Sequence, residues 1–468
     1  MEEISADVVV IGSGPAGQKA AIQAAKLGKK VIVVERLFEP GGNCLFSGTI
    51  PSKTLREGIL DLTRFNEQSF HEFSYKLGDV TITELSGRLN KVIDEEKNMV
   101  YRQFKKNNIR LLIGTARFEN ANMLILVDAD YRLLYQIRSA CFIIATGSKP
   151  RNPNNVPFDK EVILDSTSLL GIHEVPKTMV VLGGGIIGSE YASFFAALGT
   201  EVTIIDKKDH ILPMLDAEIG IHLQTALTDI GLRFMGQKEP EEILRKGNRA
   251  YVRFKDGTSV EADILLYALG RTANVDSLQL ENTGVRVDEK GYIPVNALFQ
   301  TVVPHIYAVG DVIGGPSLAS TSMEQGRLAA LQASGAKTHH FPSLYPIGIY
   351  TIPEISCCGY TEEQLKELDF HYEIGRAYYY EIARSHIVGS NVGMFKILFH
   401  AETLEILGVH VIGRGATEVI HIGQMAIGFR AKINYFIDQV FNYPTFAEGY
   451  RVAALNGFNK IRNKNTIV

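Results

Sequence analysis

The sequence predicts an α/β protein with two domains of the same design, each built on a parallel sheet, followed by a C-terminal α+β domain. Three observations lead to this expectation. A segment made of a strand, a glycine-rich turn, a helix and a second strand occurs at residues 7–35 and again at residues 179–206. The chain has 468 residues, which exceeds the usual length of a single core. Beyond residue 345, short apolar strands and amphipathic helices alternate without a third glycine-rich turn.

The first segment begins with the apolar run Asp7–Ile11, which has the length of a buried strand. A Gly-x-Gly-x-x-Gly turn at 12–17 follows, then an alanine-rich helix up to Gly28 and a strand, Val31–Val34, that ends at Glu35. This order is typical of a Rossmann-like dinucleotide-binding domain, in which pyrophosphate binds at the helix N-terminus and the acid binds ribose hydroxyls. The predicted contacts to this dinucleotide are Gly12, Gly14, Pro15, Ala16, Gly17, Glu35 and Arg36.

The second segment repeats the first at a constant displacement. Gly183, Gly185 and Gly188 correspond to the three glycines of the first turn, and Asp206 corresponds to Glu35; each pair differs by 171 positions. We therefore expect a second dinucleotide site on the same chain. Its predicted contacts are Gly183, Gly185, Ile186, Ile187, Gly188, Glu190, Asp206, Lys207 and Lys208.

The choice of nucleotide at the second site stays open between two interpretations. Asp206 favours NAD, because a carboxylate at this position binds ribose hydroxyls and repels a 2′-phosphate. Lys207 and Lys208 follow immediately and offer positive charges that would pair with such a phosphate, or else they lie in an ordinary solvated turn.

The remaining pattern defines the predicted domain boundaries. Residues 94–107 are expected to form a helix and residues 110–148 a set of short strands that ends in Ala145-Thr146-Gly147. A proline-rich linker at 150–157 leads into the second domain. The expected division is a first domain at 1–150 that resumes at 276–344, a second domain at 151–275 and an interface domain at 345–468.

The stretch from Gly41 to Lys53 follows the first dinucleotide-binding segment and contains a single cysteine, Cys44. A Cys-x4-Cys pair here would form a dithiol able to exchange electrons, but the second position is Thr49, whose hydroxyl forms no disulfide. The predicted ligand contacts in this stretch are Gly42, Asn43, Cys44, Gly48, Thr49 and Lys53.

Composition narrows the function classes. The formal net charge of −4 gives no indication of a nucleic-acid or membrane-surface partner. The four cysteines form neither a Cys-x-x-Cys pair nor a disulfide framework, which is typical of a reducing, cytoplasmic location. The adjacent Cys357 and Cys358 are expected in the core, and the twelve histidines show no ligand spacing, so no metal is predicted.

With these landmarks, the chain resembles the flavoprotein disulfide reductase family over essentially its whole length. The matching segments are Gly12–Gly17, Gly41–Lys53, Ala145–Gly147, Gly183–Glu190, Gly270-Arg271, Gly310-Asp311 and Tyr443-Pro444-Thr445. The resemblance implies FAD at the first dinucleotide site, NAD(H) or NADP(H) at the second, and a homodimer, at least, formed through the C-terminal domain. It also implies that Asp311 contacts the flavin ribityl chain, that Lys53 lies beside flavin N5 with Glu190 as its carboxylate partner, and that Gly270, Arg271, Gly310 and Tyr443 belong to the site.

Two departures from the family pattern change the expected reaction. Thr49 stands at the second cysteine of the disulfide reductases, and Tyr443 stands at their catalytic histidine. Together with segments such as Asn442–Thr445 and Arg451–Gly457, these residues resemble a narrower group, the soluble pyridine nucleotide transhydrogenases. The expected reaction is a reversible ping-pong hydride transfer from NADPH through FAD to NAD⁺, with Lys53, Glu190 and Cys44 at the reacting centre.

Other functions stay open. The alternatives are an NADH-specific flavoprotein oxidase or diaphorase, a dihydrolipoamide dehydrogenase-like oxidoreductase, and a non-catalytic scaffold that keeps the fold. Cys44 itself has two interpretations: an electronic or redox role beside the flavin, or a residue retained from a dithiol ancestor. Ile186 is expected either to cover the nicotinamide pocket or simply to pack the helix against its strand.

Overall fold

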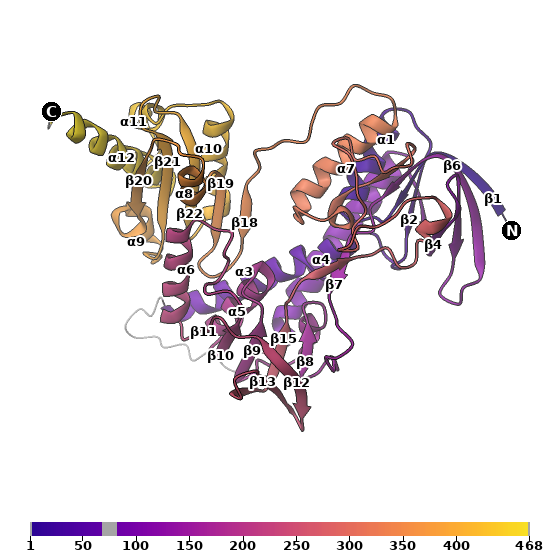
Figure 1. Cartoon of the computed structure of the whole chain (residues 1–468), viewed down its shortest axis with the longest axis horizontal. Helices are drawn as coiled ribbons and strands as arrows, with labels where there is room; N and C mark the ends of the chain where they lie inside the picture. Colours follow the sequence, from indigo (N-terminus) through magenta and orange to yellow (C-terminus); the bar gives the residue numbers. More distant parts are fainter. Residues whose placement is uncertain (1, 68–81, 467–468) are drawn as a thin grey trace. The chain divides into compact units, whose positions relative to one another are not determined.

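The computed structural model describes residues 2–67 and 82–466, which form two compact units (Figure 1). The first unit contains Met1–Leu55, Thr83–Asn152 and Gly270–Pro342, and the second contains Arg56–Ile82, Pro153–Leu269 and Ser343–Val468. Parallel sheets in both units and an antiparallel sheet near the C-terminus confirm the predicted α/β class.

A seven-stranded sheet with the order β3-β2-β1-β6-β5-β4 forms the centre of the first unit, and β17 pairs with β6 on the side opposite β1. The strands of this unit are β1 (Glu2–Ile11), β2 (Val31–Glu35), β3 (Arg110–Ile113), β4 (Thr115–Asn120), β5 (Met123–Val127), β6 (Leu133–Ile144), β7 (Ser148–Pro150), β16 (Arg271–Ala273) and β17 (Ile306–Ala308). Strands β1, β2, β3, β6 and β17 are parallel, whereas β4, β5 and β6 form an antiparallel meander. The carboxyl ends of β1 and β6, where the strand order reverses, are the expected ligand edge of such a sheet.

Helices α1 (Pro15–Lys26), α4 (Ile82–Lys106) and α7 (Ala319–Ala333) contribute buried side chains to the core of this unit. Helix α2 (Gly42–Phe46) and the 3-10 helices η2 (Leu280–Asn282) and η3 (Gly310–Ile313) also belong to it, and α3 (Thr49–Glu67) begins in it and continues into the second unit. Helices α1 and α7 lie side by side (Figure 1). A Cβ at Gly326 would come within 2.1 Å of the Ala16 carbonyl oxygen, so only glycine permits this approach. Helix α4 begins twelve positions before the predicted helix at 94–107.

The second unit contains a five-stranded parallel sheet with the order β11-β10-β9-β15-β8, which repeats the β3-β2-β1-β6-β17 order of the first unit. Its elements are β8 (Ile163–Asp165), η1 (Ser168–Gly171), β9 (Thr178–Leu182), α5 (Ile186–Ala197), β10 (Glu201–Ile205), α6 (Ala217–Asp229), β11 (Arg233–Met235), β12 (Pro240–Lys246), β13 (Arg249–Phe254), β14 (Ser259–Ala262) and β15 (Ile264–Tyr267). The sequence repeat at a spacing of 171 residues is therefore also a structural repeat.

The C-terminal part of the second unit is an antiparallel sheet with the order β18-β19-β22-β21-β20, covered by α10 and α12. Its elements are β18 (Ile347–Ile349), β19 (Ile355–Gly359), α8 (Glu362–Glu367), β20 (Tyr372–Tyr378), η4 (Tyr379–Glu381), α9 (Ala383–Ile387), β21 (Met394–His400), β22 (Ile406–Ile412), α10 (Ala416–Gly428), α11 (Asn434–Asp438) and α12 (Glu448–Thr466). An aromatic cluster that includes Tyr379, Phe395, Phe436 and Tyr450 is fully buried beneath the helices. The four-segment domain division expected from sequence stays a prediction.

Candidate functional site: two dinucleotide cradles and a lone thiol

The first glycine turn joins β1 to α1, and its three glycines differ in how much space a side chain would have. A Cβ at Gly12, whose φ is +103°, would lie 2.4 Å from the Ala145 carbonyl oxygen, and one at Gly17 would lie 1.9 Å from the Gly12 oxygen. These two positions are closed by backbone packing. A Cβ at Gly14 would meet nothing within 4 Å, and Gly14 caps α1 without any side-chain cap. The first turn of α1 thus has no side-chain cap, and the space beside Gly14 is open, an arrangement that suits an anionic group at the helix N-terminus.

Glu35 is held by the turn that it follows. The side chain is 5% exposed, and its Oε2 accepts hydrogen bonds from the Ser13 N–H at 2.9 Å and the Ser13 hydroxyl at 2.6 Å. Oε1 accepts a bond from the Leu37 N–H at 2.9 Å. An ionised carboxylate offers about four lone-pair sites, so these contacts orient Glu35 and leave acceptor capacity for a ligand hydroxyl.

The second turn, between β9 and α5, reproduces this arrangement. A Cβ at Gly183 would lie 2.7 Å from the Ala268 oxygen, whereas one at Gly185, the uncapped N-terminus of α5, would meet nothing within 4 Å. The acid also repeats its contacts, since Asp206 accepts from the Gly184 N–H at 2.6 Å and from the Lys208 N–H at 2.9 Å. Both donors lie 171 positions after Ser13 and Leu37, so the two acids are fixed by homologous bonds.

Lys207 and Lys208 are exposed in the loop after Asp206. The pKa of Glu239 is lowered, mainly by a hydrogen bond with Lys255 and to a smaller extent by the positive charge of Lys207. Ile186 and Ile187 are half-buried at the start of α5, where either of the roles expected for Ile186 is sterically possible.

The stretch around Cys44 lies on α2 and the first turn of α3. Burial raises the pKa of the Cys44 thiol, while a hydrogen bond with the Thr49 side chain and the charge of Lys53 act in the opposite direction. The thiol is therefore protonated at neutral pH in the free protein and has a hydroxyl, not a second thiol, as its neighbour. The Lys53 ammonium donates to the Ser52 hydroxyl at 3.3 Å. Of the other cysteines, Cys141 and Cys358 are buried, as expected for Cys358, whereas Cys357 is only half-buried and the expectation of a core position for it is wrong. Burial raises the pKa of Cys141 and Cys357 to about 12 and that of Cys358 to about 11.

Glu190 is 4% exposed on α5 and is oriented by residues that sequence analysis did not identify. Its Oε1 accepts a hydrogen bond from the Tyr350 N–H at 2.8 Å. The Tyr350 ring lies under the guanidinium of Arg56, which is also paired with Glu354 at 3.1 Å. These partners are separated from Glu190 by more than a hundred positions, so no local pattern in the sequence could have indicated them.

Asp311 lies in η3 and takes part in a partly buried polar network with Ser148, Asn43 and Arg271. The Ser148 hydroxyl donates to Asp311 Oδ2 at 2.6 Å and accepts from Arg271 Nε at 2.8 Å. The Ser148 carbonyl accepts from Asn43 Nδ2 and, at 2.9 Å, from Arg271 Nη2. The structure thus brings three predicted residues together through Ser148, which the sequence motifs did not single out.

Each glycine turn forms a dinucleotide cradle together with its acid: Gly12–Gly17 with Glu35 in the first cradle, and Gly183–Gly188 with Asp206 in the second. The other predicted residues differ in exposure and in backbone conformation. Arg36 is exposed after Glu35, and a Cβ at Gly42 would lie 2.8 Å from the Gly14 Cα. Gly48 precedes α3, and Gly147, Gly270 and Gly310 have φ values of +68°, +101° and +76°. Tyr443 is 72% exposed on the C-terminal domain. Glu448, which the family resemblance matches to the glutamate that orients the catalytic histidine, lies at the start of α12 and has a buried carboxylate oxygen with no hydrogen-bond partner within residues 2–67 and 82–466.

These features fit two dinucleotides. The open space at Gly14 and Gly185 admits a pyrophosphate at each helix N-terminus, and the two fixed acids suit ribose hydroxyls. Thr146 supplies a further indication in the first unit, because its hydroxyl is buried without a partner in the part of the chain that the structure describes.

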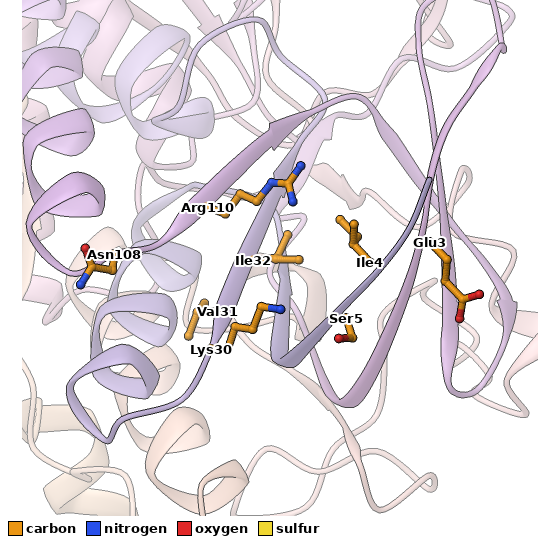
Figure 2. Close-up of a pocket in the computed structure, with 8 residues that line it drawn as sticks. All are labelled: Glu3, Ile4, Ser5, Lys30, Val31, Ile32, Asn108 and Arg110. Atoms are coloured by element: carbon orange, nitrogen blue, oxygen red, sulfur yellow. The ribbon is translucent and has the colours of Figure 1, made fainter. Parts of the chain in front are cut away.

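In the described part of the chain, no group of three His, Cys, Asp or Glu side chains could hold a metal ion, and no helix is long and apolar enough to cross a membrane. A cavity of about 340 Å³ lies at the amino ends of β1, β2 and β3 (Figure 2). It is lined by Glu3, Ile4, Ser5, Lys30, Val31, Ile32, Asn108 and Arg110. Because the glycine turn follows the carboxyl end of β1, this cavity is separate from the first cradle.

Comparison with known proteins agrees with this geometry. Residues 6–326 match the model of the pyridine nucleotide-disulphide oxidoreductases, and residues 345–454 match the dimerisation domain of the same family. Soluble pyridine nucleotide transhydrogenase from Mycobacterium bovis is 45% identical over 460 residues, covering 98% of both chains. The protein of that name from Salmonella paratyphi B is 43% identical over 459 residues, covering 97% of this chain and 98% of the relative.

Solved structures show the same architecture. LpdA from Mycobacterium tuberculosis superposes with a TM-score of 0.88 at 23% identity, covering 97% of this chain and 99% of the other. The HOCl-induced flavoprotein disulfide reductase RclA from Escherichia coli has a TM-score of 0.87 at 27% identity, covering 96% and 99%.

Proposed function

Because this chain belongs to the pyridine nucleotide-disulphide oxidoreductase family, we propose that it is a soluble transhydrogenase that uses FAD to move a hydride from NADPH to NAD⁺. The observation that carries the proposal is the pairing of Cys44 with the Thr49 hydroxyl in a chain whose two dinucleotide cradles are both intact. A disulfide substrate needs a second thiol at this position, whereas hydride transfer between nicotinamides needs none.

Each cradle has a defined task in this proposal. The N-terminus of α1 and Glu35 hold the FAD pyrophosphate and ribose, Asp311 holds the ribityl chain, and the N-terminus of α5 with Asp206 holds the nicotinamide nucleotide. FAD, when bound, supplies a two-electron carrier that accepts a hydride from one nicotinamide and gives it to another. Lys53 places a positive charge that favours the reduced form, and Glu190, fixed by the Tyr350 N–H, orients that ammonium. NADPH and NAD⁺ occupy the second site in turn, which gives ping-pong kinetics.

Anaerobic titration tests the proposed function directly. NADPH is expected to bleach the flavin absorbance of the purified protein, and subsequent NAD⁺ is expected to restore it. Steady-state turnover with NADPH and a thio-analogue of NAD⁺ should give parallel lines in double-reciprocal plots. Protein that cleaves a small disulfide at a comparable rate would contradict the proposal.

Replacing Thr49 with cysteine is expected to create the missing dithiol. Anaerobic reduction of the wild-type protein should consume two electrons per flavin, because Cys44 has no thiol partner at Thr49. The Thr49→Cys variant should consume four after mild oxidation, since two thiols at these positions form a disulfide by losing two electrons and two protons. Dithionite titration measures the count, and Thr49→Ser, which keeps the hydroxyl, is the matched control. Four electrons in wild-type protein would show that another acceptor exists.

A second candidate function, an NADH-specific diaphorase or oxidase, is favoured by Asp206. Its carboxylate is held by the Gly184 and Lys208 N–H groups and cannot swing away from a 2′-phosphate without losing both bonds. Consumption of NADH and oxygen without any reduction by NADPH would support this candidate over the transhydrogenase.

Asp206→Asn is expected to shift nucleotide preference toward NADPH. Asparagine keeps an acceptor for one backbone N–H but removes the negative charge, whose repulsion of a phosphate at 4 Å is about 1–4 kcal/mol. The ratio of kcat/KM for NADPH to that for NADH should therefore rise roughly tenfold or more. Asp209→Asn, in the same exposed loop, is the control and should leave the ratio within about twofold. An unchanged ratio in Asp206→Asn would mean that the loop lysines decide specificity.

The oligomer is proposed to be a homodimer, and the protein is proposed to be cytoplasmic. The C-terminal domain exposes large apolar side chains, among them Met425 at 63%, Phe429 at 81% and Val440 at 92%. The match to the family's dimerisation domain assigns this part of the chain to an interface, and a second copy would cover these side chains.

Phe429→Glu combined with Val440→Glu is therefore expected to yield a monomer by light scattering. Charged side chains at an apolar interface oppose its desolvation. Ile230→Glu, which alters a partly exposed apolar residue after α6, is the control and should leave the mass unchanged. A double variant that keeps the wild-type mass would place the interface elsewhere.

A further inference from the structure

Ser148 is the meeting point of three segments of the first unit. It begins β7, which pairs with β16 so that Ser148 lies opposite Ala273 and Pro150 opposite Arg271. Its side chain is 2% exposed, and the turn before it is further fixed by Asn274, whose Nδ2 donates to the Thr146 oxygen at 3.0 Å. A polar side chain this deeply buried must be satisfied internally, and its partners determine what it does.

The bonds of Ser148 fix the direction of its proton. A hydroxyl has one proton to donate and two lone pairs to accept with. Arg271 Nε–H occupies one lone pair of the Ser148 oxygen at 2.8 Å, and the carboxylate oxygen Asp311 Oδ2, which can only accept when ionised, lies 2.6 Å from the same oxygen. The hydroxyl proton therefore points to Asp311, and Arg271 makes this orientation the stable one.

The same residue is anchored through its main chain. The Ser148 carbonyl oxygen receives Arg271 Nη2 at 2.9 Å and also Asn43 Nδ2, from the α2 segment that contains Cys44. Ser148 thus cannot shift without breaking bonds to both β16 and α2. Since its hydroxyl engages only Oδ2 of Asp311, the position of the second oxygen, Oδ1, is fixed at the same time.

We propose that Ser148 is a positioning residue for the flavin: with Arg271 it orients the Asp311 carboxylate so that Oδ1 meets the ribityl hydroxyls. This inference rests on the proposed binding of FAD at Asp311. In Ser148→Ala, Arg271 Nε loses its acceptor and Asp311 Oδ2 loses its donor, so the carboxylate is free to rotate toward the guanidinium. Bonds to charged groups are stronger than neutral ones, and FAD affinity should fall roughly tenfold.

A double-mutant cycle on FAD affinity tests the proposal. Wild-type protein, Ser148→Ala, Asp311→Ala and the double variant are stripped of flavin, and the Kd for FAD is measured by quenching of flavin fluorescence. Ser148→Ala is expected to raise the Kd for FAD roughly tenfold in the wild-type background but less than about twofold in the Asp311→Ala background. The reason is that Ser148 affects FAD binding by orienting the Asp311 carboxylate, which the second background lacks. Equal losses in both backgrounds would overturn the proposal.

Ser139 provides a control that distinguishes an effect on flavin positioning from a general effect on packing. Ser139 is 4% exposed in the same unit, and its hydroxyl bonds the Asp7 and Cys141 backbone rather than Asp311. Ser139→Ala should leave the Kd for FAD within about twofold, while urea unfolding of the flavin-free variants should show similar midpoints for both substitutions. A larger loss of flavin affinity in Ser139→Ala than in Ser148→Ala would also overturn the inference. If wild-type protein itself does not bind FAD, the proposed function fails before the cycle begins.

Discussion

Lys396→Met is expected to lower the free energy of unfolding by about 3–5 kcal/mol, the cost of leaving the buried Asp216 carboxylate without its cation. The Lys396 side chain on β21 is completely buried. Its ammonium contacts Asp216 at 2.8 Å, Glu218 at 3.0 Å and Glu362 at 2.7 Å. Methionine has a similar length but no charge, so the variant removes all three contacts with little change in packing volume.

These ion pairs connect the N-terminus of α6 to β21 and α8 of the C-terminal domain. Asp216 caps α6 by accepting from the Glu218 N–H, and its other oxygen accepts from the Glu362 N–H at the start of α8. Arg376 on β20 holds Glu218 in a bidentate pair at 2.6 and 2.9 Å. Loss of Lys396 should therefore loosen α6 as well as the sheet.

The pH dependence of this variant has a defined sign. Burial acts to raise the pKa of Glu362, but its bonds to Lys366 and Lys396 lower it to about 2, from an ordinary value of 4.5. A carboxylate with a lowered pKa contributes stability that is present above about pH 4.5 and is lost as the pH falls toward 2. The pKa values of Asp216 and Glu218 are lowered in the same direction. The stability difference between wild type and Lys396→Met should therefore be larger at pH 7 than at pH 3, with the decrease beginning below about pH 4.5.

Urea unfolding at both pH values measures the effect, and Lys366→Met is the matched control. Lys366 also pairs with Glu362, at 2.8 Å, but its side chain is 60% exposed, so its removal should cost at most about 1 kcal/mol. Equal losses of unfolding free energy in Lys396→Met and Lys366→Met would show that the burial of Lys396 does not increase its contribution to stability.

Gly185→Ala is expected to abolish reduction of the flavin by nicotinamide nucleotides while leaving bound flavin in place. The added methyl group would meet no protein atom within 4 Å, so the fold should tolerate it. It would instead fill the space at the uncapped N-terminus of α5 and prevent the backbone from approaching the pyrophosphate. Loss of two hydrogen bonds to the charged pyrophosphate should weaken the binding of NAD(P)H at least roughly 100-fold.

The reciprocal variant in the first turn is the control. Gly14 has the same open surroundings at the N-terminus of α1, so Gly14→Ala should fold but purify without flavin. Flavin content after gel filtration and stopped-flow reduction by NADPH and NADH distinguish the two variants. Flavin loss in Gly185→Ala, or normal reduction of that variant, would contradict the assignment of the two cradles.

The repeated units were predictable because their signals are local. Turn glycines, the apolar strands on either side and the acid at the second strand end lie within about thirty residues, and backbone sterics alone require the glycines at Gly12 and Gly183. The predicted helix at 94–107 was too short: the apolar, half-buried Leu89 and Ile93 belong to the same helix, α4, but they are separated by polar residues that obscured the pattern.

The substitution of Thr49 for a second thiol could also be recognised from the chain alone, because reactivity at that point depends on which atoms are present. Tertiary structure alone decided how the site is supported. Ser148 beside Asp311, Tyr350 beside Glu190 and Lys396 beside Asp216 join segments 150 or more residues apart. Such contacts follow from burial, since desolvated polar groups must find partners wherever the packed chain places them, and no local spacing encodes that choice.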